Sequence, residues 1–338
     1  MRIGVVGGGL IAQVAHLPAL RALDALYELV ALAEPDAGVR EAIARRYGIA
    51  AHTDHRALLD AHELDALLVC SPNGTHARVT LDALDAGLHV LVEKPLCLSP
   101  RDAQEIVSCA RARGRVVQVG YMKRYDPAYE LLLEHAPEAG PLRLASTITV
   151  DHGIGTRLRP AGFAAPPQSP EAAEQVADAI GSDDPRHVRP YSGAFAGALV
   201  HDVNLVLGVA DRDWRITDAA TAHDGSLAYG AWASAEARWT ALWLHAPAAG
   251  TFSEELRLSG ADGVLALRFP APYHGSAPAQ LRIDGEPRRC WAPSANAYAR
   301  SLEHFHACIT GGEPCRTPAE QGARDVALLA ELYRAAIA

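Results

Sequence analysis

One lysine in the sequence stands where an ammonium group could take part in proton transfer. The segment HVLVEKPL (residues 89–96) is an apolar run that ends in Glu93 and Lys94, and Pro95 then fixes the bend of the chain. A lysine that is partly removed from water and lies near a second positive charge has a lowered pKa, which suits proton transfer. The alternative is a solvated lysine in a surface turn, and the segments upstream decide between the two.

A glycine motif near the N-terminus predicts a phosphate-binding turn. In VVGGGLIA (residues 5–12), Gly7 and Gly9 follow an apolar run and precede a segment with helical periodicity. The first glycine permits a tight turn, the second lets a pyrophosphate approach the backbone at the helix N-terminus, and Ala12 is small enough for close packing. A glycine turn without a ligand is the alternative. The residues predicted to contact a dinucleotide here are Gly7, Gly9, Leu10 and Ile11.

The second apolar run, in LVALAEPD (residues 29–36), leads into an acidic residue, Glu34. In a dinucleotide site, an acid about 20 residues after the glycines accepts hydrogen bonds from the ribose hydroxyls and repels a 2′-phosphate. NAD is therefore favoured over NADP, although Arg40 and Arg45 could soften that preference. Glu34 could alternatively cap a surface turn.

Two further connections are predicted to line the cofactor. The third apolar run leads into VCSPNGTHA (residues 69–77), and the fourth ends in the lysine segment. Residues at the carboxyl ends of parallel strands near the switch point of the sheet face the ligand. For His76, a surface role at a helix start is the alternative. The residues predicted to contact the cofactor from these connections are Ser71, Pro72, Asn73, His76, Glu93 and Lys94.

The elements that position these residues alternate between strands and helices. The predicted strands are nearly continuous in apolar residues, which is typical of strands buried on both faces. Helical periodicity appears between them, and several of these helices end in glycine. The pattern predicts a parallel, doubly wound Rossmann sheet in a domain of residues 1–120. The strands are predicted at Arg2–Val6, Glu28–Ala33, Ala66–Cys70, His89–Val92 and Val116–Val119, and the helices at Ile11–Leu23, Ala37–Tyr47, Thr75–Ala86 and Pro100–Arg113.

The rest of the chain, residues 121–338, predicts a second, α+β domain. Residues 151–190 are rich in Pro, Gly, Ala and Asp and read as a loop with one helix at Pro170–Ile180. Strand-like segments separated by turn signals fill residues 216–283, which predicts a mainly antiparallel sheet. Helices are predicted at Ala297–Ile309 and Pro318–Ile337.

Composition excludes some classes of function. The chain has 338 residues, 49% of them apolar and 21% charged, and a formal net charge of −9, which disfavours nucleic acid as a partner. The N-terminal apolar run lacks a clear cleavage site, and no apolar run reaches the roughly 20 residues of a membrane span. The six cysteines form no CxxC pair, so we expect reduced thiols and a cytoplasmic protein.

The segments VVGGGLIA, ALAEPD, SPNGTH, VEKP and VGYMKRYDPAY together resemble the Gfo/Idh/MocA oxidoreductase family. The resemblance implies an N-terminal Rossmann domain, a C-terminal domain built on a large open antiparallel sheet, and NAD(P)-dependent oxidation or reduction of sugars, cyclitols and related alcohols. The lysine of the family's EKP motif binds cofactor and substrate and assists proton transfer, and that role carries over to Lys94. Family members pair through the open sheet, so the resemblance also implies a homodimer or homotetramer.

A second family marker, GGxxxDxGxH, is only partly matched. In SGAFAGALVHDVN (residues 192–204), His201 matches the histidine, whereas Gly197 stands at the position of the aspartate. His201 is predicted to be a general base, and a core histidine with satisfied hydrogen bonds is the alternative. Asp151, His152 or Tyr191 could take the part of the missing aspartate.

Other polar residues are candidates for substrate binding. Tyr121, Lys123 and Arg124 follow the last Rossmann strand and could bind sugar hydroxyls or a carboxylate, although a structural linker role is an alternative for each. His152, Tyr191 and His201 complete the predicted substrate set, and Arg157 and Arg159 are weaker candidates. No metal is predicted, because His304 and His306 lie about 200° apart on a helix.

These inferences favour an NAD(H)-dependent oxidoreductase that moves a hydride between nicotinamide and a secondary alcohol or ketone of a sugar, glycoside or cyclitol. One alternative is a redox-neutral NAD-dependent lyase or glycosidase, in which the same nicotinamide oxidises and then reduces the sugar around an elimination. Another is a non-catalytic NAD-binding sensor.

Overall fold

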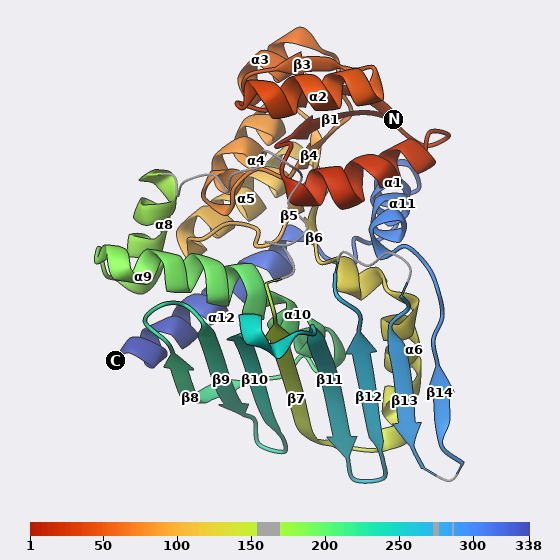
Figure 1. The fold of residues 1–338 in the computed structure, drawn as a ribbon, viewed down its shortest axis with the longest axis vertical. Helices are drawn as coiled ribbons and strands as arrows, with labels where there is room; N and C mark the ends of the chain where they lie inside the picture. The colour runs from red at the N-terminus through yellow and green to blue at the C-terminus, as the bar shows by residue number, and fades with distance from the viewer. Residues whose placement is uncertain (154–169, 273–276, 286) are drawn as a thin grey trace. The chain divides into compact units, whose positions relative to one another are not determined.

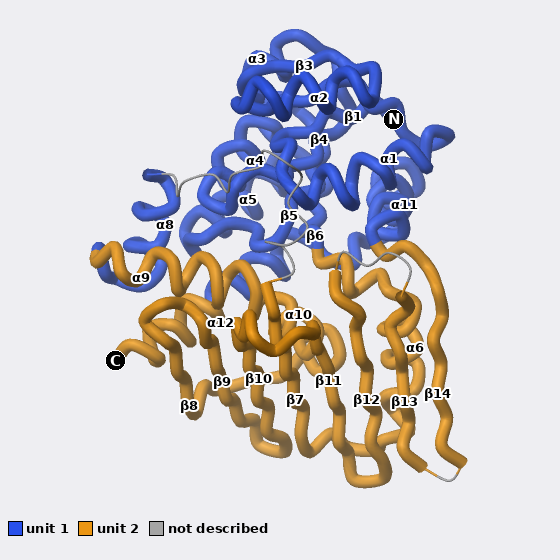
Figure 2. The backbone as a smooth tube through the Cα atoms, in the orientation of Figure 1, with its two compact units in different colours: residues 1–120, 158–183, 298–327 blue, residues 121–157, 184–297, 328–338 orange. Residues whose placement is uncertain are grey.

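A computed structural model describes residues 1–153, 170–272, 277–285 and 287–338 (Figure 1). The backbone forms two compact units, which Figure 2 shows in different colours. Among the described residues, the N-terminal unit contains 1–120, 170–183 and 298–327, and the C-terminal unit contains the remainder. We expected a division at residue 120. Two later segments nevertheless group with the first 120 residues.

The N-terminal unit is built on a six-stranded parallel sheet with the order β3-β2-β1-β4-β5-β6. The predicted parallel Rossmann sheet is confirmed, and the apolar continuity of the strands agrees with their burial, which is complete in β4. The sequence did not predict the short edge strand β3 or the helix α3 that follows it. The strands are β1 (Arg2–Val6), β2 (Glu28–Ala33), β3 (Ala50–His52), β4 (Ala66–Val69), β5 (His89–Glu93) and β6 (Val117–Gly120).

Several of the helices between these strands begin at a residue whose side chain caps the first turn. Asp36 caps α2 by accepting a hydrogen bond from the amide of Val39 at 2.8 Å, and Ser99 caps α5 through the amides of Arg101 and Asp102. The first helix is different, because it opens with a π-helical turn, η1 (Ala12–His16), before α1. The helices are α1 (Leu17–Ala22), α2 (Ala37–Tyr47), α3 (His55–Ala61), α4 (His76–Asp85, after the 3₁₀ turn η2, Asn73–Thr75) and α5 (Pro100–Arg113).

Two segments from later in the chain complete the N-terminal unit. Helix α11 (Ala297–Thr310) contributes Leu302 and Phe305 to the same hydrophobic cluster as β1 and β2. The hydroxyl of Tyr27 donates to the carbonyl of Leu302 at 2.6 Å, and the side-chain amide of Gln118 donates to the carbonyl of Ser301 at 2.9 Å. Helix α8 (Pro170–Ile180) is the other segment. The predicted helices at 170–180 and 297–309 are therefore present.

The C-terminal unit is built on an eight-stranded sheet with the order β14-β13-β12-β11-β7-β10-β9-β8. Every neighbouring pair is antiparallel except β7 and β10, which are parallel, so the predicted antiparallel sheet is confirmed as a mainly antiparallel one. The central strand β7 was not predicted. The strands are β7 (Leu142–Asp151), β8 (Arg215–Thr221), β9 (Leu227–Ala233), β10 (Arg238–His245), β11 (Ser253–Gly260), β12 (Val264–Phe269), β13 (Gln280–Asp284) and β14 (Arg289–Trp291).

Side chains on the strands of this sheet alternate between buried and accessible positions. On β7, Thr147 and Thr149 are buried, whereas Leu144 and Ile148 are exposed to 39% and 50%. This alternation is typical of a sheet with one covered face and one open face. The helices of the unit are α6 (Pro127–His135), α9 (Pro185–Arg189) and α10 (Val200–Val209), with the π-helix η5 (Pro190–Leu199) between α9 and α10. Helix α12 (Ala319–Ile337) is shared, because its residues up to Ala327 group with the N-terminal unit and those from Leu328 group with the C-terminal unit.

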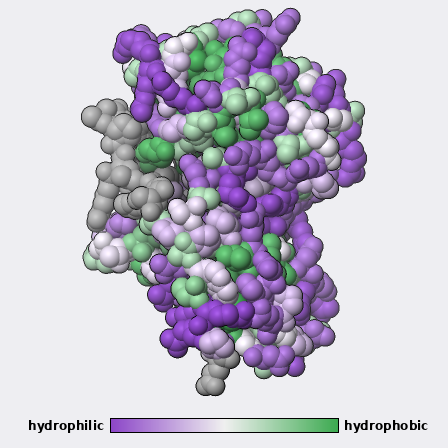
Figure 3. All heavy atoms as spheres, turned by 90° about the vertical axis from the view of Figure 1, so that its right-hand side faces the viewer, coloured by the Kyte–Doolittle hydropathy of each residue, from purple (hydrophilic) through white to green (hydrophobic). Residues whose placement is uncertain are grey.

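The continuous helix Pro185–Val209 is the one helix of the described residues that is long and apolar enough to cross a membrane. We expected no such run, because polar residues interrupt the sequence. Of the most apolar 18-residue window of this helix, 61% is buried inside the structure, as in the core helix of a folded domain. On the face shown in Figure 3, hydrophobic residues form separate patches within a mainly hydrophilic surface.

Candidate functional site

The glycine turn after β1 leaves no room for a side chain. Gly7 has a φ of +97°, and a Cβ built on it would lie 2.5 Å from the carbonyl oxygen of Cys70. The amide of Gly7 donates to the carbonyl of Ala33 at 2.9 Å, which joins the turn to the end of β2. Leu10 and Ile11 follow at the start of the helix and are partly exposed. This bare backbone at a strand-to-helix turn fits a dinucleotide pyrophosphate.

Glu34 lies directly against the glycine turn. Its carboxylate accepts hydrogen bonds from the amide of Gly8 at 2.7 Å and from the amide of Asp36 at 2.9 Å. The guanidinium of Arg40 donates to the carbonyls of Glu34 and Pro35 at 2.8 and 2.9 Å. A carboxylate fixed at the end of β2 suits ribose hydroxyls, and the nearby arginine is the cation that a 2′-phosphate would need.

The ends of the neighbouring strands are level with the glycine turn. Val6 pairs with Ala33 on one side and Val69 on the other, and Val69 pairs in turn with Val92. Because the strands are parallel, their carboxyl ends meet at one edge of the sheet. The structure therefore brings the glycine turn, Glu34, the loop Ser71–Asn73 and the EKP segment to this edge, which we call the carboxyl edge.

His76 holds two loops of the carboxyl edge together. It is buried, and its ring nitrogens lie 2.7 Å from the carbonyl oxygen of Pro95 and 2.8 Å from that of Ser71. Burial lowers the pKa of His76, although both carbonyl contacts favour the charged ring. We expected this histidine to contact the cofactor directly. That contact stays a prediction, and the two carbonyl contacts show that His76 also holds the loops that carry Ser71 and Lys94.

A second side chain, which the sequence did not reveal, ties the same two loops together from α8. The buried amide of Gln175 accepts from the backbone amide of Leu98 at 3.1 Å and donates to the carbonyl of Gly74 at 2.7 Å. Nearby, the hydroxyl of Ser99 is hydrogen-bonded to the carboxylate of Asp178. Helix α8, which was predicted at Pro170–Ile180 within a segment otherwise predicted to be loop, therefore braces the carboxyl edge.

Glu93 is a buried anion held by a histidine. Nε2 of His16 lies 2.7 Å from Oε1 of Glu93, and the amide of Lys94 donates to Oε2 at 3.1 Å. Burial raises the pKa of Glu93, but the hydrogen bond from His16 and the positive charges of His16 and Lys94 outweigh burial, so the pKa lies below its ordinary value. We predicted that Glu93 contacts the cofactor. That contact stays a prediction, and in the structure the carboxylate is engaged inside the unit, beside the backbone of Lys94.

The π-helical turn explains why His16 was not recognised from the sequence. In a π turn, hydrogen bonds join residues five apart, so the face of the helix that a residue occupies is displaced by one position from the α-helical pattern. His16 ends this turn and lies edge-on to the ring of Tyr298 at 5.2 Å between ring centroids. An α-helical reading of residues 11–23 places the side chains differently.

Lys94 follows the end of β5 and is partly exposed at the carboxyl edge. The peptide between Lys94 and Pro95 is cis. The Lys94 backbone is fixed by Glu93 on one side and by the His76 contact to Pro95 on the other. An ammonium group held at this edge can polarise a substrate oxygen or exchange a proton with it.

In the C-terminal unit, His201 lies in the first turn of α10 and is partly exposed. The helix before it is π-helical through Leu199, so the four-residue spacing from Gly197 no longer places that glycine directly beneath His201. The missing carboxylate of the family marker therefore cannot be located by counting one α-helical turn. The next residue, Asp202, points into the buried side, where the hydroxyl of Thr149 donates to it at 3.3 Å.

Asp202 belongs to a buried cluster that also includes Lys123. The ammonium of Lys123 forms an ion pair with Glu254, and all three side chains are buried. Burial and the charge of Glu254 raise the pKa of Asp202 to about 8, whereas Lys123 acts in the opposite direction. We predicted that Lys123 binds substrate. Its charge is instead neutralised inside the unit.

Arg124, Tyr121 and Tyr191 are also buried, contrary to a simple surface-binding role. The guanidinium of Arg124 donates to the carbonyl and side chain of Asn204 at 3.3 Å, and Gly208 leaves space for it, since a Cβ there would lie 2.4 Å from Cζ of Arg124. The ring of Tyr191 packs edge-on against Tyr333 at 5.4 Å. For Arg124, the hydrogen bonds to Asn204 favour a structural role over substrate binding.

His152 follows the end of β7 and is partly exposed, and Asp151 accepts a hydrogen bond from the amide of Gly153 at 2.8 Å. The weaker candidates Arg157 and Arg159 lie outside the described residues. Among the predicted substrate residues of the C-terminal unit, His201 and His152 are thus the two that carry a partly exposed imidazole.

Comparisons with known proteins agree with this geometry. A family model described as an oxidoreductase family with an NAD-binding Rossmann fold, Gfo/Idh/MocA, matches residues 1–121. The chain is 36% identical to inositol 2-dehydrogenase 3 of Saccharopolyspora erythraea over 141 residues, which cover 41% of this chain and 41% of that protein. The chain thus matches about two fifths of the length of this curated relative.

Solved structures extend the likeness to the whole fold. The 3-ketoreductase KijD10 of Actinomadura kijaniata, in complex with NADP and TDP-benzene, has a TM-score of 0.79 at 22% identity and covers 99% of this chain and 97% of its own. The WlbA dehydrogenase of Bordetella pertussis, in complex with NADH and UDP-GlcNAcA, has a TM-score of 0.75 at 18% identity and covers 100% and 96%. The two structures hold different nicotinamide cofactors. Residues 1–121, which include the glycine turn and the EKP segment, thus match the NAD-binding Rossmann domain of the Gfo/Idh/MocA oxidoreductase family.

Proposed function

We propose that the chain is an NAD(H)-dependent oxidoreductase that acts on a secondary alcohol or ketone of a sugar, glycoside or cyclitol. The observation that carries the proposal is the carboxyl edge, where the bare glycine turn, Glu34 and Lys94 lie at the level ends of neighbouring parallel strands. One relative is named an inositol 2-dehydrogenase, and one solved structure is a dehydrogenase in complex with UDP-GlcNAcA. Both names support a polyhydroxylated substrate.

In this proposal NAD, when bound, supplies the hydride acceptor or donor. Lys94 polarises the substrate oxygen and shares its proton, and His201 acts as general base or acid from the C-terminal unit. Glu93 and His76 keep the backbone of Lys94 fixed. The buried state of Lys123 and Arg124 leaves Lys94, His201 and His152 as the polar groups that we assign to the substrate.

The preference for NAD over NADP rests on Glu34. Its carboxylate is fixed by two backbone amides at the end of β2, so a 2′-phosphate would meet a negative charge that cannot turn away easily. We expect NAD to bind at least tenfold more tightly than NADP, a difference of about 1.4 kcal/mol. In Glu34→Ala the difference should shrink, because Arg40 then lies nearest to a 2′-phosphate.

We further propose that the open face of the C-terminal sheet pairs with a second copy of the chain, as a homodimer or homotetramer. The exposed Leu144 and Ile148 on the central strand β7 support this assignment, since apolar side chains on an open sheet face gain from being covered.

The experiment that tests the proposal is a binding measurement for NAD and NADP followed by a panel of inositols, sugars and glycosides scored for nicotinamide reduction. We expect NAD to bind and at least one polyol to be oxidised with one NADH formed per product. A failure to bind either nucleotide would overturn the proposal. Consumption of a glycoside without net nicotinamide reduction would favour the redox-neutral alternative, and binding without any turnover would favour a sensor.

A further inference from the structure

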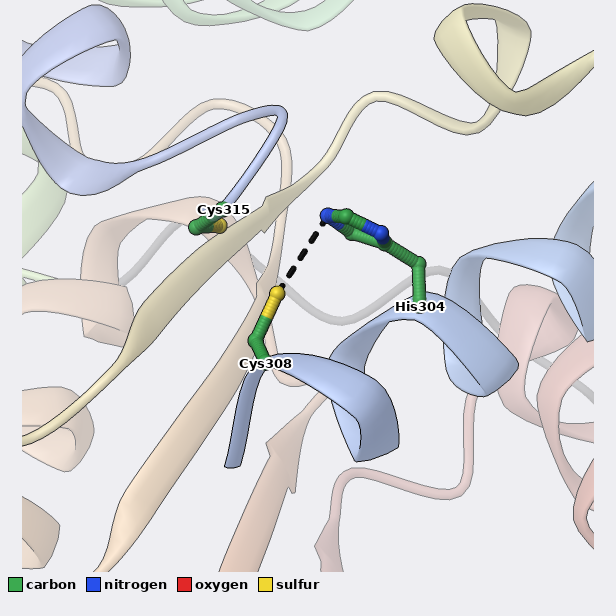
Figure 4. A group of neighbouring side chains, drawn as sticks. All are labelled: His304, Cys308 and Cys315. Carbon is green, nitrogen blue, oxygen red and sulfur yellow. Dashed lines mark hydrogen bonds between the residues drawn. The ribbon is translucent and has the colours of Figure 1, made fainter. Parts of the chain in front are cut away.

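Three potential metal ligands lie together in the N-terminal unit, apart from the carboxyl-edge residues. His304 and Cys308 belong to α11, and Cys315 belongs to the segment that follows this helix (Figure 4). Their ligating atoms all lie within 4.8 Å of one another. All six cysteines of the chain are in the described residues, and each is a free thiol. The cluster therefore brings together two thiols and one imidazole.

The spacing of these atoms is close to that of a tetrahedral metal site. Nε2 of His304 lies 3.3 Å from Sγ of Cys308. With metal–sulfur bonds of about 2.3 Å and metal–nitrogen bonds of about 2.0 Å, ligand atoms of a tetrahedral site lie about 3.5 to 3.8 Å apart. The third ligand needs to move by no more than about 1 Å to complete that arrangement, which a side-chain rotation can supply.

Helix periodicity places the first two ligands on one face. His304 and Cys308 are four residues apart, so they project from the same side of α11. The argument against a metal concerned His304 and His306, which do lie on different faces. Nδ1 of His306 contacts the hydroxyl of Thr310 at 3.3 Å instead. The relevant pair is the histidine with the cysteine one turn later.

The surroundings of His304 suit a metal-bound imidazole. Nδ1 of His304 lies 3.7 Å from a carboxylate oxygen of Glu313, which can accept its proton when Nε2 binds a metal. Nε2 now accepts a hydrogen bond from the amide of Arg316 at 3.0 Å. A metal would take that lone pair. The amide of Arg316, the residue after Cys315, can then donate to a thiolate sulfur.

The identity of the donors selects the class of ion. Two thiolates and an imidazole favour zinc, whereas magnesium and calcium require oxygen ligands. Cys308 is 5% exposed and the side chain of His304 is 12% exposed, so the ligands lie in a largely dry environment. We propose that His304, Cys308 and Cys315 bind one zinc ion, with water in the fourth position.

The place of the cluster in the fold gives the ion a structural role. The segment after α11 runs along β6, the edge strand of the parallel sheet. The amide of Val119 donates to the carbonyl of Thr317 at 2.8 Å, and the hydroxyl of Thr317 donates to the carbonyl of Val119 at 2.8 Å. A zinc ion on Cys315 fastens this segment to α11 and so covers the exposed edge of β6.

The experiment uses the full chain, reduced and freed of metal, and titrates it with Co²⁺ as a spectroscopic substitute for zinc. We expect one Co²⁺ per chain, a thiolate-to-cobalt charge-transfer band and the intense visible bands of tetrahedral cobalt, all lost on addition of Zn²⁺. In Cys315→Ser and His304→Gln the affinity should fall by more than about 100-fold, and in Glu313→Gln by about 10- to 100-fold. Cys290→Ser, which removes an exposed cysteine of β14, is the matched control and should leave the titration unchanged.

The wild-type titration does not depend on the folding of any variant. Absence of a charge-transfer band in the reduced wild-type chain would overturn the proposal, and so would a band that persists in both Cys315→Ser and His304→Gln. A disulfide between Cys308 and Cys315, found by mass spectrometry in the metal-free protein kept under reducing conditions, would also overturn it.

Discussion

Nε2 of His16 lies 2.7 Å from Oε1 of Glu93, which joins the first helix of the N-terminal unit to the residue before Lys94. The two residues are 77 positions apart in the sequence, and both are buried. The pair fixes the end of β5 from the side of the glycine turn. It supports the position of the Lys94 backbone, whose amide donates to the carboxylate of Glu93.

Replacing His16 tests this contact. In His16→Leu the carboxylate of Glu93 loses its partner while it remains buried, which should lower the free energy of unfolding by about 3 kcal/mol and weaken NAD binding. Tyr27→Phe is the control, because it removes one buried hydrogen bond at the opposite end of β2, at a cost of about 1 kcal/mol, and should leave NAD affinity unchanged. Denaturant unfolding and calorimetric NAD titration check both. Equal stability of His16→Leu and wild type would contradict the assignment.

Gly7→Ala separates the strain of a positive φ from the loss of the cofactor cradle. A methyl group at Gly7 would lie 2.5 Å from the carbonyl of Cys70, whereas a methyl group at Gly48, which also has a positive φ, would meet nothing within 4 Å. Both variants should lose about 1 kcal/mol of stability from backbone strain, and Gly7→Ala should lose more, because its methyl group clashes with the backbone of Cys70. Only Gly7→Ala should also lose NAD binding, by more than tenfold. Nucleotide titration of the two folded variants gives the result, and unaltered affinity in Gly7→Ala would refute the cradle.

Gln175→Glu tests the brace from α8. The substitution places a carboxylate oxygen where the amide of Gln175 donates to the carbonyl of Gly74, so one loop of the carboxyl edge is repelled. The loss of a buried hydrogen bond costs about 1 to 3 kcal/mol, and NAD affinity should fall by about tenfold. Gln104→Glu, on the exposed side of α5, introduces the same charge and should change nothing. Equal NAD affinities of the two variants would show that the brace is dispensable.

Asp202→Asn tests the buried cluster of the C-terminal unit through pH. The pKa of Asp202 is raised from 3.8 to about 8 in the folded protein, so the folded state binds a proton that the unfolded state releases above pH 3.8. The stabilising contribution is complete below pH 3.8 and is lost as the pH rises toward 8, at up to about 1.4 kcal/mol per pH unit. Asparagine removes this pH dependence. The free energy of unfolding of the variant, relative to that of the wild type, should therefore increase as pH rises.

Denaturant unfolding of Asp202→Asn and wild type between pH 5 and pH 8, at intervals of about one unit, measures the difference in slope. Asp218→Asn removes an exposed carboxylate of β8 and should retain the slope of the wild type. Parallel pH profiles for wild type and Asp202→Asn would mean that Asp202 is ionised in the folded state.

The sequence predicted the Rossmann sheet well because its strands are short, apolar on both faces and separated by helices of regular period. For four elements, the predicted first and last residues agree with the structure: Arg2–Val6, Glu28–Ala33, Ala37–Tyr47 and Pro100–Arg113. Strand β7 was missed because its Thr and Ser residues weaken the apolar pattern. Its parallel partner β10 pairs with residues 94 positions earlier, as in Arg238 with Leu144, a pairing that no local signal reveals.

The glycine turn and Glu34 were predictable because their roles depend on local residue types next to a strand. The contacts of Lys123, Arg124 and Gln175 were not, because each depends on a partner distant in the sequence. Lys123 pairs with Glu254, 131 positions away, and Gln175 reaches Gly74, 101 positions away. The sequence shows that a lysine or a glutamine is present, and only the fold shows whether its polar group is already occupied.

The central claim is that Lys94 takes part in proton transfer at the carboxyl edge. The most direct test is the turnover number of Lys94→Arg, measured with the polyol that the wild type oxidises. Arginine keeps the positive charge but does not release a proton near neutral pH. We predict NAD affinity within about threefold of wild type and a turnover number lower by about 10²- to 10⁴-fold. A turnover number within about threefold of the wild-type value would contradict the account, because no proton transfer could then depend on this lysine.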